Sequence, residues 1–172
     1  MSLLQRLLGG KSDPREALRP LWHRAVEISR EPAWYADCGV ADTVAGRFDM
    51  ITAILALVLL RLERDGDCRP QTALLTELFV EDMDGQLREF GVGDIVVGKH
   101  IGKLMASLGG RLGAYREALA QQGDAALEDA ARRNVTLAEG RTPEPLATRL
   151  RALAVSLDRM ATADILAGSM PR

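Results

Sequence analysis

Acidic side chains in the run FVEDMDGQLREFGVGDIVVGK, residues 79–99, are the groups in this 172-residue sequence that could perform acid–base chemistry. Asp82 and Asp84 would be the natural pair for it. They lie two positions apart, so on a helix they would point about 200° apart and could not share a proton. A wider set of charged residues at intervals of three and four predicts one helix face that either binds a partner or is solvated and partly salt-bridged. This set is Glu77, Glu81, Asp84 and Arg88.

The histidines and cysteines form no recognised catalytic or metal-binding motif. His23 and His100 are the only histidines, and neither belongs to an HxxxH, HExxH or His-Cys grouping. Cys38 and Cys68 lie far apart without a CxxC spacing. The GVGDIVVG stretch follows a predicted helix and lacks the Lys-Ser/Thr ending of a P-loop. We therefore predict a protein that is not an enzyme and that needs neither a metal nor a cofactor.

Composition excludes several further classes. Hydrophobic residues make up 47% and charged residues 27%, which is ordinary for a globular domain with one core. Aromatic residues are only 4%, so the core must be aliphatic, which favours packing of helices on helices. A formal charge of −2 argues against a specific nucleic-acid binder. The longest apolar run, residues 50–60, has about half of the ~20 residues that a membrane-spanning helix needs.

Hydrophobic periodicity predicts an all-α fold, a single compact bundle of about six helices. Proline, glycine and capping residues delimit the segments. The segment 43–64 is apolar on nearly all faces, so we expect it to be the buried central helix. A loop that carries Trp34 and Tyr35 precedes it. The expected helices are 13–30, 43–64, 70–90, 94–122, 124–134 and 144–166.

The chain is expected to divide into a flexible N-terminal segment, residues 1–12, and a helical domain, residues 13–172. The N-terminal segment has no acidic residue and places leucines at helical spacing beside two basic residues. It is either a frayed terminus or a peripheral contact to a membrane surface. Its leucines and basic residues are Leu3, Leu4, Arg6, Leu7, Leu8 and Lys11.

A second informative run, WYADCGVADTVAGRFD, covers residues 34–49 and leads into the central helix. Asp42 or Thr43 can cap that helix. Arg47 lies beside its apolar stripe, and a partly buried guanidinium needs a carboxylate partner. We expect that partner to be Glu81, Asp82 or Asp84 of the acidic helix.

Trp34 and Tyr35 have two interpretations. Adjacent aromatic residues in a loop most often anchor it to the core, and they are also frequent in the centres of binding surfaces.

The segment 94–122 carries a strip of small residues every four positions. Each interior glycine costs about 1 kcal/mol relative to alanine, so the strip predicts compensation by close approach of another backbone. The strip consists of Gly98, Gly102, Ala106, Gly110 and Ala114. Between these positions, Met105 is assigned to the core.

Long stretches of the chain resemble the ubiquinol-cytochrome c chaperone family. The resemblance runs from about residue 22 to about residue 134 and rests on WYADCGVADTVAGRFDM, on LLTELFVEDMDGQLREFGVGDIVVGKHIGKL, and on RLGAYREAL with Asn134 downstream. In the family the acidic segment precedes an LRE-GVGD pattern. Here that pattern is carried by Glu81, Asp82, Asp84, Leu87, Arg88, Glu89, Gly91, Val92, Gly93 and Asp94.

The resemblance implies an assembly factor that binds newly made cytochrome b, the hydrophobic subunit of the bc1 complex, and catalyses no reaction. Mitochondrial members carry a targeting extension that this sequence lacks, so a bacterial relative is expected. It would be cytoplasmic, with or without peripheral contact to the inner membrane. The family also suggests a small helical partner or the ribosome as further partners.

Such a chaperone needs a groove with exposed apolar surface and a charged rim, which we expect beside the helices 43–64, 70–90 and 94–122. Arg111 is expected at its edge together with two lysines. The candidate partner-binding residues are Trp34, Tyr35, Arg47, Glu81, Asp82, Asp84, Arg88, Glu89, Asp94, Lys99 and Lys103. The candidate structural residues are Asp42, Thr43, Gly46, Phe48, Gly91, Gly93 and Gly98.

Two other functions remain open. The small-residue strip could pair two copies into a homodimeric interaction module with another client. Alternatively, the protein could be an enzyme for a small hydrophobic molecule in which Asp82, Asp84 or Glu89 binds a metal.

Overall fold

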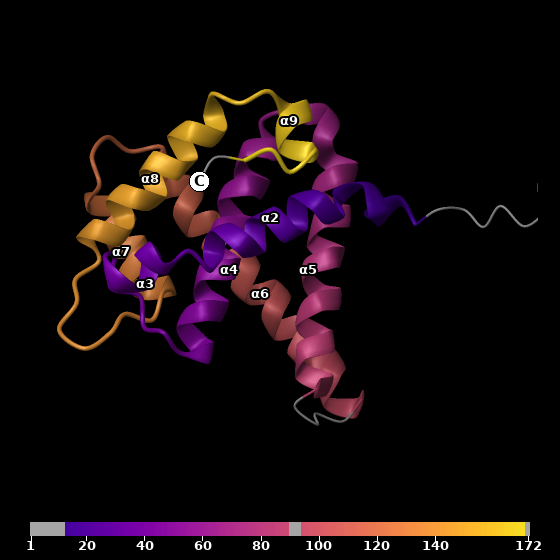
Figure 1. Ribbon diagram of the computed structural model, residues 1–172, viewed down its shortest axis with the longest axis horizontal. Coiled ribbons are helices and arrows are strands. Elements are labelled where there is room, and N and C mark those ends of the chain that lie inside the picture. The colour runs from indigo at the N-terminus through magenta and orange to yellow at the C-terminus, as the bar shows by residue number, and fades with distance from the viewer. Residues whose placement is uncertain (1–12, 90–93, 171–172) are drawn as a thin grey trace, which may run out of the picture.

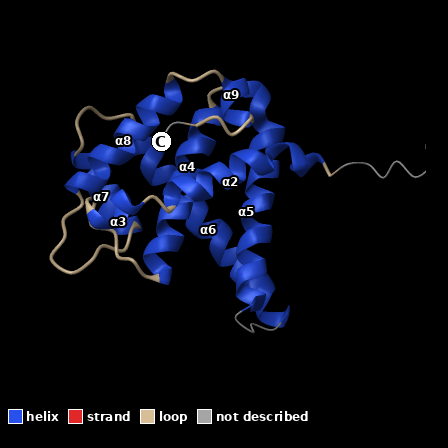
Figure 2. Cartoon of the chain, in the orientation of Figure 1, coloured by secondary structure: helices blue, strands red, loops and turns tan. Residues whose placement is uncertain are grey.

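The structure is a computed structural model that describes residues 13–89 and 94–170, with side chains described for 13–86 and 101–170. Figure 2 shows this part of the chain as helices joined by loops. The predicted all-α fold is therefore confirmed. Within the described residues, six helices have ten or more residues, in agreement with the expected number.

The long helices lie close to their expected positions. A first turn, η1, precedes them, and two short helices, α3 and α9, complete the bundle (Figure 1). Their bounds are η1 Pro14–Leu18, α2 Arg19–Ser29, α3 Pro32–Ala36, α4 Val44–Glu63, η2 Gly66–Cys68, α5 Arg69–Glu89, α6 Asp94–Leu119, α7 Ala125–Asn134, α8 Glu144–Asp158 and α9 Thr162–Leu166.

Three boundaries differ from the prediction, each for a local reason. The first helix is a 3-10 turn followed by α2, because Pro20 has no N–H to continue an α-helix from the preceding turn. The expected loop after α2 contains α3, since Pro32 both ends one helix and begins the next. The last helix is divided because Arg61 donates hydrogen bonds to the carbonyls of Leu157 at 3.1 Å and Met160 at 2.9 Å.

α4 is the buried central helix. All its residues from Asp49 to Leu60 are buried, and α2, α5, α6 and α8 pack around it (Figure 1). Its N-terminal and C-terminal turns are the parts that reach solvent. None of the described helices combines the length and the hydropathy that spanning a membrane requires. The high apolar content of α4 is therefore accounted for by its position in the core.

A buried ion pair joins α4 to α6. Asp49 and Arg111 are each 8% exposed, and their carboxylate and guanidinium are in direct contact. Arg111 also donates to the Asn134 carbonyl at 2.9 Å and to the Ser107 hydroxyl. Asp49 accepts from both the backbone N–H of Thr136 at 2.9 Å and its hydroxyl at 2.7 Å. The two charges therefore connect α4, α6 and the segment after α7.

Tyr115 lies one turn beyond Arg111, and its side chain is fully buried. No hydrogen bond joins its hydroxyl to another of the described residues. Burial raises the pKa of Tyr115 well above its ordinary value of 10.0, and the nearby Asp49 carboxylate acts in the same direction. The phenol is therefore held neutral in the folded protein.

Asp49→Ala should lower the free energy of unfolding by about 3–5 kcal/mol, because it leaves the Arg111 charge buried and the Thr136 donors unpaired. Urea unfolding followed by circular dichroism measures this loss. The matched control is Arg132→Ala, which removes an exposed ion pair with Asp129 and should change stability by less than about 0.5 kcal/mol. A loss below about 1 kcal/mol for Asp49→Ala would contradict the assigned role.

Tyr115→Phe should leave stability at neutral pH unchanged or slightly higher, because a buried hydroxyl without a partner costs free energy. Above the unfolded pKa of 10.0, the unfolded tyrosine loses its proton while the folded one keeps it, so stability falls as pH rises. The free energy of unfolding of the wild type should therefore fall by up to about 1.4 kcal/mol more per pH unit than that of the variant. Urea unfolding between about pH 9 and about pH 11 tests this, and identical slopes would contradict it.

Candidate functional site

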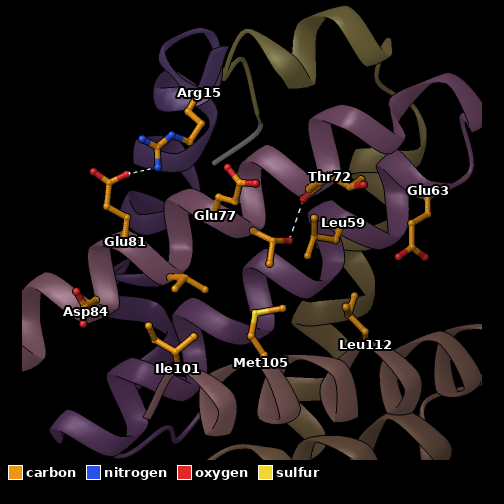
Figure 3. A pocket seen from close by; sticks show the side chains of 13 residues that line it. Arg15, Leu59, Glu63, Thr72, Glu77, Glu81, Asp84, Ile101, Met105 and Leu112 are labelled. Carbon is orange, nitrogen blue, oxygen red and sulfur yellow. Dashed lines mark hydrogen bonds and ion pairs between the residues drawn. The ribbon is translucent and has the colours of Figure 1, made fainter. Parts of the chain in front are cut away.

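An open groove lies between α5 and α6, with α4 as its floor (Figure 3). Its volume is about 750 Å³. The apolar part of its surface comes from all three helices: Leu59, Ala73, Val80, Ile101, Met105 and Leu112. The remaining lining residues are Arg15, Glu63, Thr72, Thr76, Glu77, Glu81 and Asp84, and this set of thirteen residues is called the α5–α6 groove below.

The groove is open because α5 and α6 project beyond the rest of the bundle (Figure 1). The buried face of α6 is formed by Leu108, Arg111, Tyr115 and Ala118. Met105 lies outside that face and is 42% exposed, so its assignment to the core was wrong. A large apolar side chain at this exposure, beside further apolar groups, is the kind of surface that partner proteins cover.

The two walls differ in chemistry. Ile101, Met105 and Leu112 line the α6 side, whereas Glu77 and Glu81 lie on the α5 side (Figure 3). On α5 the acidic residues recur at the spacing of one helix face, as the sequence predicted. The α6 edge of the groove is therefore apolar, whereas the α5 edge carries carboxylates beside Ala73 and Val80.

The N-terminal turn closes one side of the groove. Arg15 of η1 donates to Glu81 at 2.9 Å, while Arg19 of α2 lies 3.9 Å from the same carboxylate. Arg15 is held in place by Asp13, and the hydrogen bond from its side chain lowers the pKa of that carboxyl from 3.8 to about 2. Asp13 therefore stays ionised at any physiological pH and fixes the arginine that contacts the acidic wall.

Asp82 and Asp84 face different sides of α5, in agreement with their spacing of two residues. Asp84 lines the α5–α6 groove, whereas Asp82 lines a second depression between α2 and α5. That depression has a volume of about 680 Å³ and mixed charge, from Arg19, Arg30 and Glu27. The acidic residues of α5 therefore belong to two surfaces.

The 34–49 run contains the N-cap and the first turns of α4. Thr43 is the cap, since its hydroxyl accepts a hydrogen bond from the N–H of Gly46 at 3.2 Å. Gly46 is required because a Cβ there would lie 2.0 Å from the carbonyl oxygen of Ala41. Phe48 packs partly buried against Phe79, with ring centroids 6.4 Å apart.

The expected pairing of Arg47 with the acidic helix was wrong. Arg47 is exposed and forms an ion pair with Asp42 at 2.6 Å, which lowers the pKa of that carboxyl. The buried guanidinium that needs a carboxylate is instead Arg111, which was expected at the edge of a groove. Both arginines are close to apolar stripes, and sequence spacing alone does not distinguish them.

Trp34 and Tyr35 anchor α3. Trp34 is 1% exposed, donates to the Ile28 carbonyl at 2.7 Å and carries the Arg149 guanidinium 4.4 Å above its ring. Tyr35 is partly buried and donates to the Ser29 carbonyl at 2.8 Å. Neither residue lines the α5–α6 groove, so a role of either in partner binding stays a prediction.

Several candidate residues lie outside the described side chains. They are Arg88, Glu89, Gly91, Gly93, Asp94, Gly98 and Lys99. Lys103 is described and exposed on α6, but it does not line the groove. Residues that sequence reasoning did not single out as part of the site include Leu59, Glu63 and Val80.

Of the small-residue strip, Ala114 packs partly buried against the core, whereas three other described members make no close contact. Gly102, Ala106 and Gly110 are exposed, and a Cβ on either glycine would meet no atom within 4 Å. The expected compensation by an approaching backbone is therefore absent from this part of the molecule. Pairing of two copies through the strip stays a prediction.

Among the described residues, no group of three His, Cys, Asp or Glu side chains could hold a metal ion.

Comparison with known proteins gives two matches. A family model described as "Ubiquinol-cytochrome C chaperone" matches residues 36–171, a range that contains α4, α5 and α6. The chain is also similar to a solved structure, the crystal structure of the Cbp3 homolog from Brucella abortus, with 26% identity and a TM-score of 0.79. That alignment covers 98% of this chain and 95% of the other. No curated protein matches the chain.

Gly46→Ala should destabilise the protein by about 2–3 kcal/mol, because its Cβ would collide with a backbone carbonyl that cannot move away cheaply. Thermal unfolding measures the loss. Gly109→Ala on α6 is the matched control: a Cβ there meets nothing within 4 Å, so the variant should be as stable as wild type or up to about 1 kcal/mol more stable. Equal effects of the two substitutions would contradict the close approach of Gly46 to the Ala41 carbonyl.

Proposed function

The chain belongs to the ubiquinol-cytochrome c chaperone family, and from this membership we propose that it is an assembly factor for the bc1 complex that binds newly made cytochrome b. The α5–α6 groove is the proposed client-binding surface. The observation that carries this proposal is an open groove with apolar side chains from three helices and an acidic edge. A hydrophobic membrane subunit outside the bilayer must cover its apolar segments, and such a groove can cover them.

The protein acts by binding and does not catalyse a reaction. The groove has no enclosed volume that would keep water from a reacting group, and its carboxylates are spread over the end of α4 and one edge of α5 instead of converging on one point. An open surface also suits a client that must later leave for its own complex.

We assign client binding to the helical domain of residues 13–172, and we place the protein at the cytoplasmic side of the membrane. A newly made cytochrome b segment would be accessible there before its insertion is complete. Residues 1–12 form the segment that we propose for additional contact with the membrane surface, because their leucines and basic residues have the composition of interfacial helices.

Met105→Asp should reduce the amount of cytochrome b that co-purifies with a tagged full-length chain by about tenfold, because a charge in the apolar edge opposes client burial. Val155→Asp is the control, because Val155 lies on α8, outside the groove, and has the same 42% exposure as Met105. Both variants should keep the wild-type unfolding temperature. Bound cytochrome b is quantified by immunoblot from membranes of matched strains.

Two results would contradict the proposal. Unchanged capture by Met105→Asp would remove the groove from client binding. Absence of cytochrome b from the wild-type purification, together with normal bc1 complex in a strain lacking the protein, would reject the proposed client.

A further inference from the structure

The charge of the α5–α6 groove is unbalanced. Among the described residues that line it, four are carboxylates and one is a base, Arg15. Glu81 is paired with Arg15, and Glu63 is paired at 2.6 Å with Arg116, which lies outside the groove. No ion pair joins Glu77 to another of the described residues, although its side chain is exposed at the middle of the α5 wall. Glu77 lies within the electrostatic field of Arg15 but has no direct ionic contact with a described residue, so an occupant with positive charge would gain a direct ion pair there.

The part of the groove lined by described residues is also short. Its α5 wall extends from Thr72 to Asp84, which corresponds to about 18 Å at a rise of 1.5 Å per residue. A helix that crosses a membrane needs about 30 Å of apolar length. This described part can therefore cover little more than half of such a helix, and the rest of that helix must extend past it.

The cytoplasmic ends of transmembrane helices have a characteristic chemistry. The apolar span is followed there by an excess of Lys and Arg. An apolar stretch of three turns with a basic flank matches a groove that has an apolar α6 edge and an acidic α5 edge. A segment with acidic flanks would instead be repelled by Glu77 and the neighbouring carboxylates.

We infer that the α5–α6 groove selects the cytoplasmic end of a newly made transmembrane helix, with its apolar turns against Ile101, Met105 and Leu112 and its basic flank against Glu77. This inference rests on the proposed client-binding function and specifies which part of the client is bound. It assigns the apolar edge to affinity and the acidic edge to the choice and orientation of the segment.

Three labelled helical peptides test this selection with the full-length chain, by fluorescence anisotropy. They share a Leu/Ala-rich stretch of three turns and end in Lys, Ser or Glu residues. The Lys peptide should bind most tightly and the Glu peptide least tightly, and the difference should shrink as salt is raised. Glu77→Lys should weaken binding of the Lys peptide by about fivefold and change binding of the Ser peptide by less than about twofold.

Glu117→Lys is the matched control. Glu117 lies on α6, is exposed, forms no ion pair with another described residue and lines a different depression, between α6 and α7. The substitution changes the net charge of the protein by the same amount, so it should leave all three affinities unchanged. An equal loss with Glu117→Lys would show that overall charge attracts the peptide, and it would overturn the inference.

Other outcomes also overturn the inference, and each identifies a different reason. Equal affinity for the Lys and Glu peptides would mean that the groove does not select by charge; capture of cytochrome b by the same preparation would then leave the proposed function standing. Tighter peptide binding by Leu7→Asp would identify the chain's own N-terminal leucines as the occupant. A dimer in sedimentation that Met105→Asp dissociates would identify a second copy.

Discussion

The ion pair between Asp49 and Arg111 is the constraint on which the arrangement of the bundle depends. Two charges removed from water must contact each other and fill their remaining hydrogen-bond positions, which here requires Asn134 and Thr136 as well. The observed placement of α4, α6 and the end of α7 meets that requirement. An aliphatic core would tolerate several helix orientations of similar energy, because leucine and alanine surfaces pack in many ways. The pair therefore contributes to the uniqueness of the fold.

Fixing α6 in this way decides which of its side chains are left outside. Arg111 points inward, so Leu108 and Tyr115 follow it into the core, while Met105 and Leu112 are directed toward α5. The α5 helix packs against η1 and α4, and its last turns project with α6 beyond the bundle. The apolar groove therefore results from the same geometry that satisfies the buried charge. A substitution that relaxed the ion pair would reshape the groove without touching its lining.

Much of the fold follows from the sequence because the signals are local. The Thr43 cap and the apolar run after it locate α4, and Pro14 and Pro70 locate the starts of η1 and α5. The acidic face of α5 also follows from spacing alone. The partner of a buried arginine is not local: Asp49 and Arg111 are 62 positions apart, and Arg47 offers the same residue type near the same helix. The exposure of Met105 could not be predicted either, because α6 carries more apolar positions than its neighbours cover.

The groove combines two requirements that usually conflict. Exposed apolar surface promotes association with any hydrophobic chain, including another copy of the same protein. An acidic edge limits this effect, since like charges oppose self-association while a basic client segment is attracted. The carboxylates of α5 contribute little to the stability of the folded chain because they are exposed. In the inferred binding mode, these carboxylates contribute to the choice between client segments.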